Sequence, residues 1–385
     1  MNTESSLLAP GPVNIHPKVR EALALPMIHH RTPEFDGILA RVLGRLKKVF
    51  MTSESVFLLS STGSGGMEAL IVNPLSSGDE VLVIDSGKFG ERWVEMCKIF
   101  GLTVHIIKTV WGEPVSVDEV RKTLTTYPRI RAVFCQACET STGVKHPIQE
   151  LGALIQPMPE TLFLVDGITA LGAFPLKMDE WGIDGLVAGS QKAFMLPTGL
   201  AFVAFSKKAW PFIEKGNLPR FYFDVRKEKK ANANGETFFS SSVALIRALD
   251  VVLDLVEKQG IDSLFAEIRK RAEFTRLFGA KLGFLLYSKA PSESLTAFVV
   301  PAGFDGQKIR LHLESRYNIT IMGGQEQAKG KIIRVGHMGY IQNHELVNLI
   351  KCLGLTLQDL NSSFIDANKI SKIAAEAEAW LQNNP

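Results

Sequence analysis

Ala188-Gly189-Ser190-Gln191-Lys192-Ala193-Phe194-Met195-Leu196-Pro197-Thr198-Gly199 is the stretch around which the chain is organised. Strand-like runs flank it at residues 184–189 and 200–205, so we expect Lys192 in a tight connection at the edge of a sheet. Partial burial lowers the pKa of an amine and makes it a nucleophile that can form a Schiff base with an aldehyde. Taken alone, Lys192 is better explained as a surface lysine in a β-turn, and the segments upstream change that interpretation.

Strand and helix patterns alternate upstream of this stretch, from residue 56 onward. Such alternation predicts a mainly parallel sheet with helices on both faces, in which ligands bind beyond the carboxyl ends of the strands. The expected strands are 56–60, 81–85, 104–108, 132–137 and 162–166, and the expected helices are 66–75, 89–100, 117–126 and 148–156.

Composition limits the class of protein. The 385 residues suit two domains, and the 43 basic and 40 acidic residues are mixed along the chain, so nucleic acid is not an expected partner. No apolar run reaches the ~18 to 20 residues that cross a bilayer. The first residues lack the build of a signal peptide, and the last carry no targeting tripeptide, so we expect a cytoplasmic protein without membrane contact.

Two cysteines, Cys135 and Cys138, have the CxxC spacing of a metal or redox site. They end an apolar run and have no second CxxC or spaced histidine pair to complete a metal shell. The pattern therefore favours two small residues at a strand end and predicts no metal site.

The segment of residues 61–66, Ser-Thr-Gly-Ser-Gly-Gly, follows a strand and opens a helix. Free backbone N–H groups and the helix dipole at such a place can hold a phosphate. The chain has neither GxGxxG at the right place nor GxxxxGK[ST], so a small phosphate monoester is favoured over a dinucleotide or nucleoside triphosphate.

Asp166 follows four apolar residues at the carboxyl end of an expected central strand. A carboxylate buried there is costly unless it meets a positive partner, and a protonated pyridine nitrogen is one such partner. A helix N-cap is the alternative. Residues 139–143, Glu-Thr-Ser-Thr-Gly, also end a strand, and their hydroxyls can bind a ligand oxygen or stabilise their own turn.

Taken together and in this order, these segments resemble the class V aminotransferases among the fold type I pyridoxal-phosphate enzymes, most closely the alanine–glyoxylate and serine–glyoxylate (serine–pyruvate) aminotransferases. The resemblance rests on the segments at residues 10–14, 61–66, 139–144, 165–166, 189–192, 321–324 and 334–336. It implies a large domain with a mainly parallel seven-stranded sheet and a smaller α+β C-terminal domain. The expected division is an extended arm over residues 1–16 lying across a surface, a large coenzyme-binding domain over 17–262 and a small domain over 263–385.

The same resemblance assigns roles to single residues. Lys192 is expected to hold pyridoxal 5'-phosphate through a Schiff base and to act as the base at Cα, and Asp166 to keep the pyridine nitrogen protonated. Arg334 is expected to grip the substrate α-carboxylate through a bidentate pair. The other expected coenzyme contacts are Thr62, Gly63 and Ser64 on the phosphate, Phe89 stacked on the ring, Thr140 and Gln191 at ring or phosphate oxygens, and Thr237 and Ser240 from the other subunit of a homodimer.

These roles predict a transaminase that moves the amino group of alanine or serine to glyoxylate, or to a similar small 2-oxo acid, in two ping-pong half-reactions. The sequence shows no obvious second cationic residue to bind a side-chain carboxylate, which argues against aspartate or glutamate as the preferred donor. Arg31 and Arg220 lie in loops that could supply such a residue. A desulfurase or other lyase on the same fold is one alternative, but Cys352 falls in an expected helix and not on a mobile loop. A redox subunit of hydrogenase type, resting on Cys135 and Cys138, is another.

Overall fold

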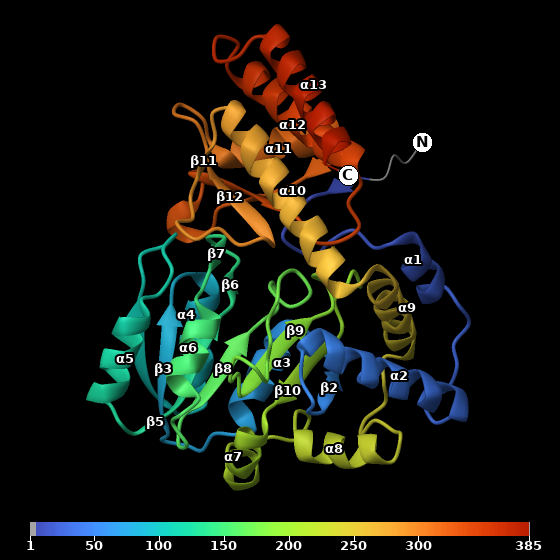
Figure 1. The fold of residues 1–385 in the computed structure, drawn as a ribbon, viewed down its shortest axis with the longest axis vertical. Helices are drawn as coiled ribbons and strands as arrows, with labels where there is room; N and C mark the ends of the chain where they lie inside the picture. Colours follow the sequence, from blue (N-terminus) through green and yellow to red (C-terminus); the bar gives the residue numbers. More distant parts are fainter. Residues whose placement is uncertain (1–4, 385) are drawn as a thin grey trace.

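A computed structural model describes residues 5–384, and its largest element is a seven-stranded sheet (Figure 1). The strand order is β2-β10-β9-β8-β5-β3-β4. Only β10 runs against its neighbours, so the mainly parallel sheet is confirmed. The strands are β2 (Val56–Leu59), β3 (Glu80–Asp85), β4 (Thr103–Lys108), β5 (Ile130–Gln136), β8 (Leu162–Asp166), β9 (Gly185–Gly189) and β10 (Ala201–Phe205).

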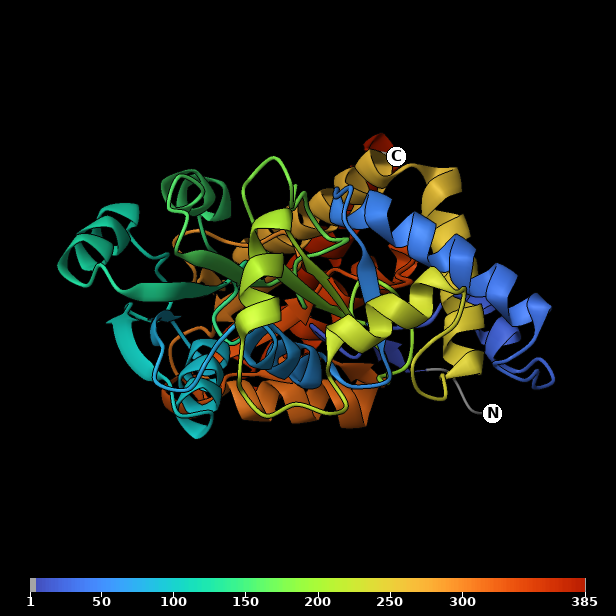
Figure 2. The ribbon, with the colours of Figure 1, turned by 90° about the horizontal axis from the view of Figure 1, so that it is seen from below.

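Helices cover both faces of this sheet, as the view from below shows (Figure 2). Successive strand residues point to opposite faces, so in β8 Phe163 and Val165 enter one core while Leu162 and Leu164 enter the other. The helices of this part are α1 (Pro17–Leu23), α2 (Pro33–Phe50), α3 (Gly63–Val72), α4 (Lys88–Ile99), α5 (Val117–Thr126), α6 (Ile148–Ile155), α7 (Trp210–Lys215), α8 (Val225–Ala233) and α9 (Val243–Gln259), with a 3-10 turn at Lys207–Ala209.

The C-terminal part is built on an antiparallel four-stranded sheet of order β11-β12-β15-β14, with helices packed on it. Helix α10 crosses from α9 of the first part to the helices of the second (Figure 1). The elements are α10 (Ile261–Lys281), β11 (Leu285–Leu286), β12 (Leu295–Val299), α11 (Gly306–Tyr317), β13 (Ile319–Thr320), β14 (Met322–Gly323), a 3-10 turn (Glu326–Ala328), β15 (Ile332–Gly336), α12 (Asn343–Leu360) and α13 (Ala367–Asn383).

The described part of the N-terminal arm, residues 5–16, is extended as expected, but residues 8–10 of it are buried and do not lie on the surface. Strand β1 (Ser6–Leu7) pairs with β13, Leu8 lies in the core of the C-terminal part, and Leu8 O accepts a hydrogen bond from the N–H of Gly336 at 2.8 Å. A side chain at Gly336 would meet the carbonyl oxygen of Ala9 at 2.1 Å. The arm therefore passes directly over the end of β15. The domain limits at residues 16/17 and 262/263 stay a prediction.

Helix α2 was not expected, although its start carries a clear signal. The Thr32 hydroxyl accepts the N–H of Phe35 at 3.4 Å, Pro33 occupies the first turn, and Glu34 and Asp36 lie where the helix dipole favours acidic side chains. Helix α3 begins at Gly63, three residues before the expected start at Gly66. No helix within residues 5–384 is long and apolar enough to cross a membrane.

Candidate active site

The expected site residues of the large sheet gather at the carboxyl ends of its strands. Asp166 is the last residue of β8 and lies opposite Gln136 of β5, while Lys192 follows β9 by three residues. The loop before α3 follows β2, and Phe89 lies in the first turn of α4, which follows β3. Because parallel strands end at one edge of a sheet, loops distant in sequence converge there.

Lys192 is buried, with 8% of its surface exposed. Its Nζ donates a hydrogen bond to the carbonyl oxygen of Pro10, in the N-terminal arm, at 2.5 Å. The pKa of Lys192 is lowered to about 8, mainly by burial and in smaller part by the charge of Arg334, whereas Cys138 and Asp166 act in the opposite direction. An amine with this pKa is partly neutral near pH 7 and therefore nucleophilic.

Asp166 is buried as well, and burial raises the pKa of its carboxyl to about 7. Its Oδ1 accepts the N–H of Ile168 at 2.8 Å, which favours the ionised form, as do the charges of Arg92 and Lys192. The N-cap alternative is not supported, because the residues after Asp166 form turns and not an α-helix. This carboxylate is suited to hold a buried positive group.

The start of α3 has the features of a phosphate site. The Thr62 hydroxyl does not cap the helix, which leaves it available to a ligand. A side chain at Gly63 would meet Cδ1 of Ile168 at 2.7 Å, so this loop lies close to the residues after Asp166. Among residues 5–384 the Oε1 atom of Gln191 is buried without a hydrogen-bond partner, so it is free to accept a hydrogen bond from a ligand donor.

Glu139 and Arg92, two residues that the sequence analysis did not single out as site residues, hold the β3–α4 loop in place. Fully buried, the Glu139 carboxylate accepts the N–H groups of Phe89 and Gly90, each at 3.2 Å, and the hydroxyl of Ser141 at 2.6 Å. The Arg92 guanidinium lies 4.9 Å from the centre of the Phe89 ring. Phe89 and Arg92 are three residues apart in an expected helix, and this spacing was a signal that the two side chains share one face.

Arg334, in β15, reaches the large sheet from the C-terminal part. Its Nη1 donates to the carbonyl oxygen of Thr140 at 2.9 Å, and its Nε to that of Gly323 at 3.0 Å. Burial lowers the pKa of Arg334 to about 10, so it remains a cation at neutral pH. The Thr140 hydroxyl pairs with that of Thr169 at 2.7 Å. Two of the five guanidinium N–H groups are used, and those of Nη2 have no partner within residues 5–384.

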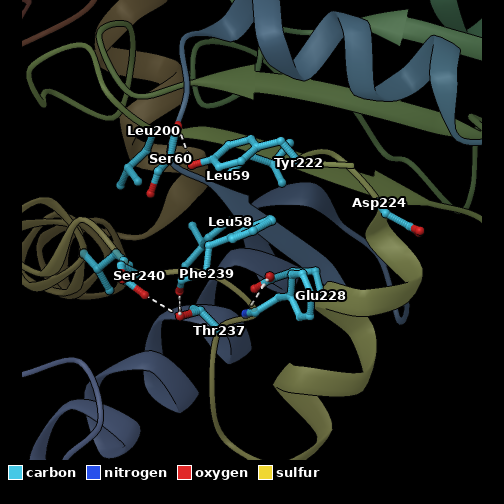
Figure 3. A pocket seen from close by; sticks show the side chains of 13 residues that line it. Leu58, Leu59, Ser60, Leu200, Tyr222, Asp224, Glu228, Thr237, Phe239 and Ser240 are labelled. Carbon is cyan, nitrogen blue, oxygen red and sulfur yellow. Dashed lines mark hydrogen bonds between the residues drawn. The ribbon is translucent and has the colours of Figure 1, made fainter. Parts of the chain in front are cut away.

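Thr237 and Ser240 are not brought to this cluster. They line a separate pocket together with Ser60, Tyr222 and Glu228, and none of the residues lining it belongs to the Lys192 cluster (Figure 3). The Thr237 hydroxyl donates to the carbonyl oxygen of Phe239 at 2.8 Å. Phenylalanine and tyrosine rings lie exposed beside the pocket: Phe221, Tyr222 and Phe238.

All four cysteines are buried and free. Cys135 packs in a core, and burial raises the pKa of Cys138 to about 12 and that of Cys352 to about 11. Cys352 lies in α12, so the mobile nucleophilic thiol of a desulfurase is not found at this position. Within residues 5–384 no group of three or more His, Cys, Asp or Glu side chains is placed to hold a metal ion.

Comparison with known proteins identifies the family. The chain is 37% identical over 389 residues to an L-aspartate–glyoxylate aminotransferase of Paracoccus denitrificans, covering 99% of this chain and 98% of that protein. It is 35% identical over 384 residues to a protein of Anabaena cylindrica named soluble hydrogenase 42 kDa subunit, covering 99% and 100%.

The fold has solved counterparts too. A crystal structure of an alanine–glyoxylate aminotransferase from Nostoc sp. superposes with a TM-score of 0.89 at 30% identity, over 93% of this chain and 96% of that one. This likeness confirms the expected fold type I architecture. Residues 20–349 match the family described as Aminotransferase class-V. The chain therefore belongs to the class-V aminotransferase family.

Proposed function

We propose that this protein is a pyridoxal-phosphate transaminase that moves the amino group of alanine or serine to glyoxylate, or to a similar small 2-oxo acid, by a ping-pong mechanism. The observation that carries the proposal is the pairing of a buried lysine, whose pKa is lowered to about 8, with a buried aspartate at the ends of adjacent strands. The Paracoccus protein and the Nostoc structure described above are both named as aminotransferases that use glyoxylate.

Bound pyridoxal phosphate supplies an aldehyde that condenses with amines and a pyridinium ring that withdraws electrons from Cα of an amino acid. The chain would hold this group through Lys192 and Asp166, with Thr62, Gly63 and Ser64 at its phosphate. Lys192, freed by the incoming amine, would take the proton from Cα and return it, because its pKa lies close to the working pH. Phe89 would stack on the ring, and Gln191 would lie beside the coenzyme and donate through its amide N–H groups to a ring or phosphate oxygen.

The substrate carboxylate would bind Arg334, whose Nη2 donates no hydrogen bond within residues 5–384. Arg334 is the cation whose charge acts on Lys192. Arg31 is paired with Glu236, and Arg220 donates to backbone carbonyls, including that of Val72. These arrangements favour a donor without a side-chain carboxylate, although the name of the Paracoccus relative makes aspartate the donor to test against.

The active unit in this proposal is a homodimer. Thr237 and Ser240 line the pocket of Figure 3, apart from the Lys192 cluster of their own chain, so they would serve the phosphate of a second chain. The exposed rings beside the pocket would be covered by that chain. Light scattering of the purified protein checks this arrangement, and a monomer that turns over at full rate would contradict it.

Absorption spectroscopy tests the reaction. The purified protein, reconstituted with pyridoxal phosphate, should show a visible band that alanine or serine bleaches and glyoxylate restores. Stopped-flow rates for alanine, serine, aspartate and glutamate at equal concentration then rank the donors. Parallel lines in double-reciprocal plots would support the two half-reactions.

Each outcome of this experiment decides one part of the proposal. A protein that cannot be reconstituted contradicts the coenzyme assignment, and the fold alone remains. A band that bleaches with aspartate more than tenfold faster than with alanine or serine contradicts the donor assignment but not the transaminase. Release of sulfide from cysteine would favour the desulfurase alternative.

A further inference from the structure

Arg92 connects the two segments expected to contact the coenzyme. It lies in α4, three residues after Phe89, and its guanidinium carbon is 4.9 Å from the centre of the Phe89 ring. Its Nη1 donates a hydrogen bond to the Ser64 hydroxyl, at the start of α3, at 3.0 Å. One side chain therefore spans the phosphate loop and the stacking residue.

The negative charge of a phosphate bound at this loop makes the contact between Arg92 and Ser64 important. A phosphate monoester carries a charge of about −1.5 to −2 at pH 7, and residues 61–66 contain no basic side chain. Backbone N–H groups and the dipole of α3 offset part of that charge. Arg92 is a full positive charge that contacts this loop directly through Ser64.

The direction of the hydrogen bond determines what Ser64 can do. A guanidinium has only donors, so the Ser64 oxygen accepts from Arg92, and its own hydrogen remains free to donate. A hydroxyl polarised by a cation is a stronger donor, because hydrogen bonds in a chain reinforce one another. Arg92 thus both aims and strengthens a donor in the phosphate loop.

Phe89 is held by the same residue. The guanidinium covers one face of its ring, a cation–π contact, so another aromatic ring can stack only on the opposite face. The backbone of Phe89 is fixed independently by Glu139. The charge of Arg92 also favours the ionised form of Asp166 by lowering the pKa of that carboxyl.

We propose that Arg92 is a positioning residue for pyridoxal phosphate, acting on its phosphate through Ser64 and on its ring through Phe89. This inference rests on the proposed function, because it presupposes the coenzyme. It adds to that function a residue that touches neither substrate nor reacting atoms. Its effect should therefore appear in coenzyme binding before it appears in turnover.

Equilibrium binding of pyridoxal phosphate to the apoprotein, followed by fluorescence, is the test. Arg92→Gln should weaken binding about 10- to 30-fold, as expected for loss of a hydrogen bond from a charged group, and Arg92→Lys should restore part of the loss. For pyridoxal, which lacks the phosphate, Arg92→Gln should weaken binding less than threefold. Lys98→Gln, which removes an exposed charge from the far end of the same helix, is the matched control.

A double-mutant cycle with Ser64→Ala examines the route. If Arg92 acts on the phosphate through Ser64, the double variant should bind pyridoxal phosphate about as weakly as the weaker single variant. Strictly additive losses, or Arg92→Gln binding within twofold of the Lys98→Gln control, would overturn the proposal. So would a lower melting temperature of the Arg92→Gln apoprotein with unchanged coenzyme affinity.

The wild-type protein is measured first, so that the two proposals fail differently. Wild-type protein that does not bind pyridoxal phosphate contradicts the proposed function and this inference with it. Tight wild-type binding that is indifferent to Arg92 contradicts this inference alone.

Discussion

Replacing Gly11 by alanine should disable Lys192 while leaving the fold intact. Gly11 belongs to the N-terminal arm and has a φ of +128°, a backbone conformation that side chains disfavour. An added Cβ would lie 2.5 Å from Nζ of Lys192, 2.6 Å from its Cδ and 2.7 Å from its Cε. Carbon atoms pack at about 3.5 to 4.0 Å, so the end of Lys192 must move by about 1 Å.

The costs to stability and to activity should differ. A side chain at this φ costs about 1–3 kcal/mol, and the clash itself adds little because the end of a lysine chain is flexible. Activity should suffer more, since a misplacement of about 1 Å can lower a rate about 10²-fold. Stopped-flow loss of the visible band with alanine measures the rate, and thermal melting measures the stability.

Gly78→Ala is the matched control. Gly78 also has a positive φ, +84°, but an added Cβ there would meet no heavy atom within 4 Å. Both variants bear backbone strain, and only Gly11→Ala reaches Lys192. Our reasoning is refuted if the two variants melt at similar temperatures and react with alanine at rates within threefold of each other.

Three further predictions follow from the buried groups. Because the pKa of Lys192 is about 8, the amount of pyridoxal phosphate that borohydride traps on the apoprotein should rise as the pH passes through 8. If a Lys192→Ala variant shows the same pH-dependent trapping, another lysine reacts. Arg334→Lys keeps the charge but not the fork, so steady-state kinetics should give a KM for the amino donor about tenfold higher or more with coenzyme affinity unchanged; an unchanged KM removes Arg334 from the substrate site. His146 is buried between the N–H of Val115 and the hydroxyl of Ser86, and burial lowers its pKa to about 4. The unfolded chain binds this proton more readily, so the free energy of unfolding should fall by about 3 kcal/mol as pH drops from 6.5 to 4, and urea titrations of His146→Gln with the same slope would contradict this.

Local patterns predicted most of the large sheet, because each of its strands is a short apolar run bounded by turns. They failed at α2, where apolar residues recur at spacings of three and four immediately after a polar, histidine-rich segment and the capping signal at Thr32 was overlooked. They placed the start of α3 too late because glycines usually end helices. In this chain a Cβ at Gly63 would lie 2.7 Å from Cδ1 of Ile168, a contact that becomes visible only when the strands are assembled.

Segments far apart in sequence complete the site, and no local pattern contains them. Arg334 meets the Thr140 carbonyl across 194 residues, and Lys192 meets the Pro10 carbonyl across 182. Both distant segments are joined to each other, since Leu8 O accepts the N–H of Gly336, two residues after Arg334. The carbonyl that holds Lys192 and the guanidinium that meets Thr140 therefore lie on two backbone segments that are hydrogen-bonded to each other. Lys192 and Arg334 are thus connected through the backbone of the arm, and the substitution at Gly11 perturbs that connection at Lys192.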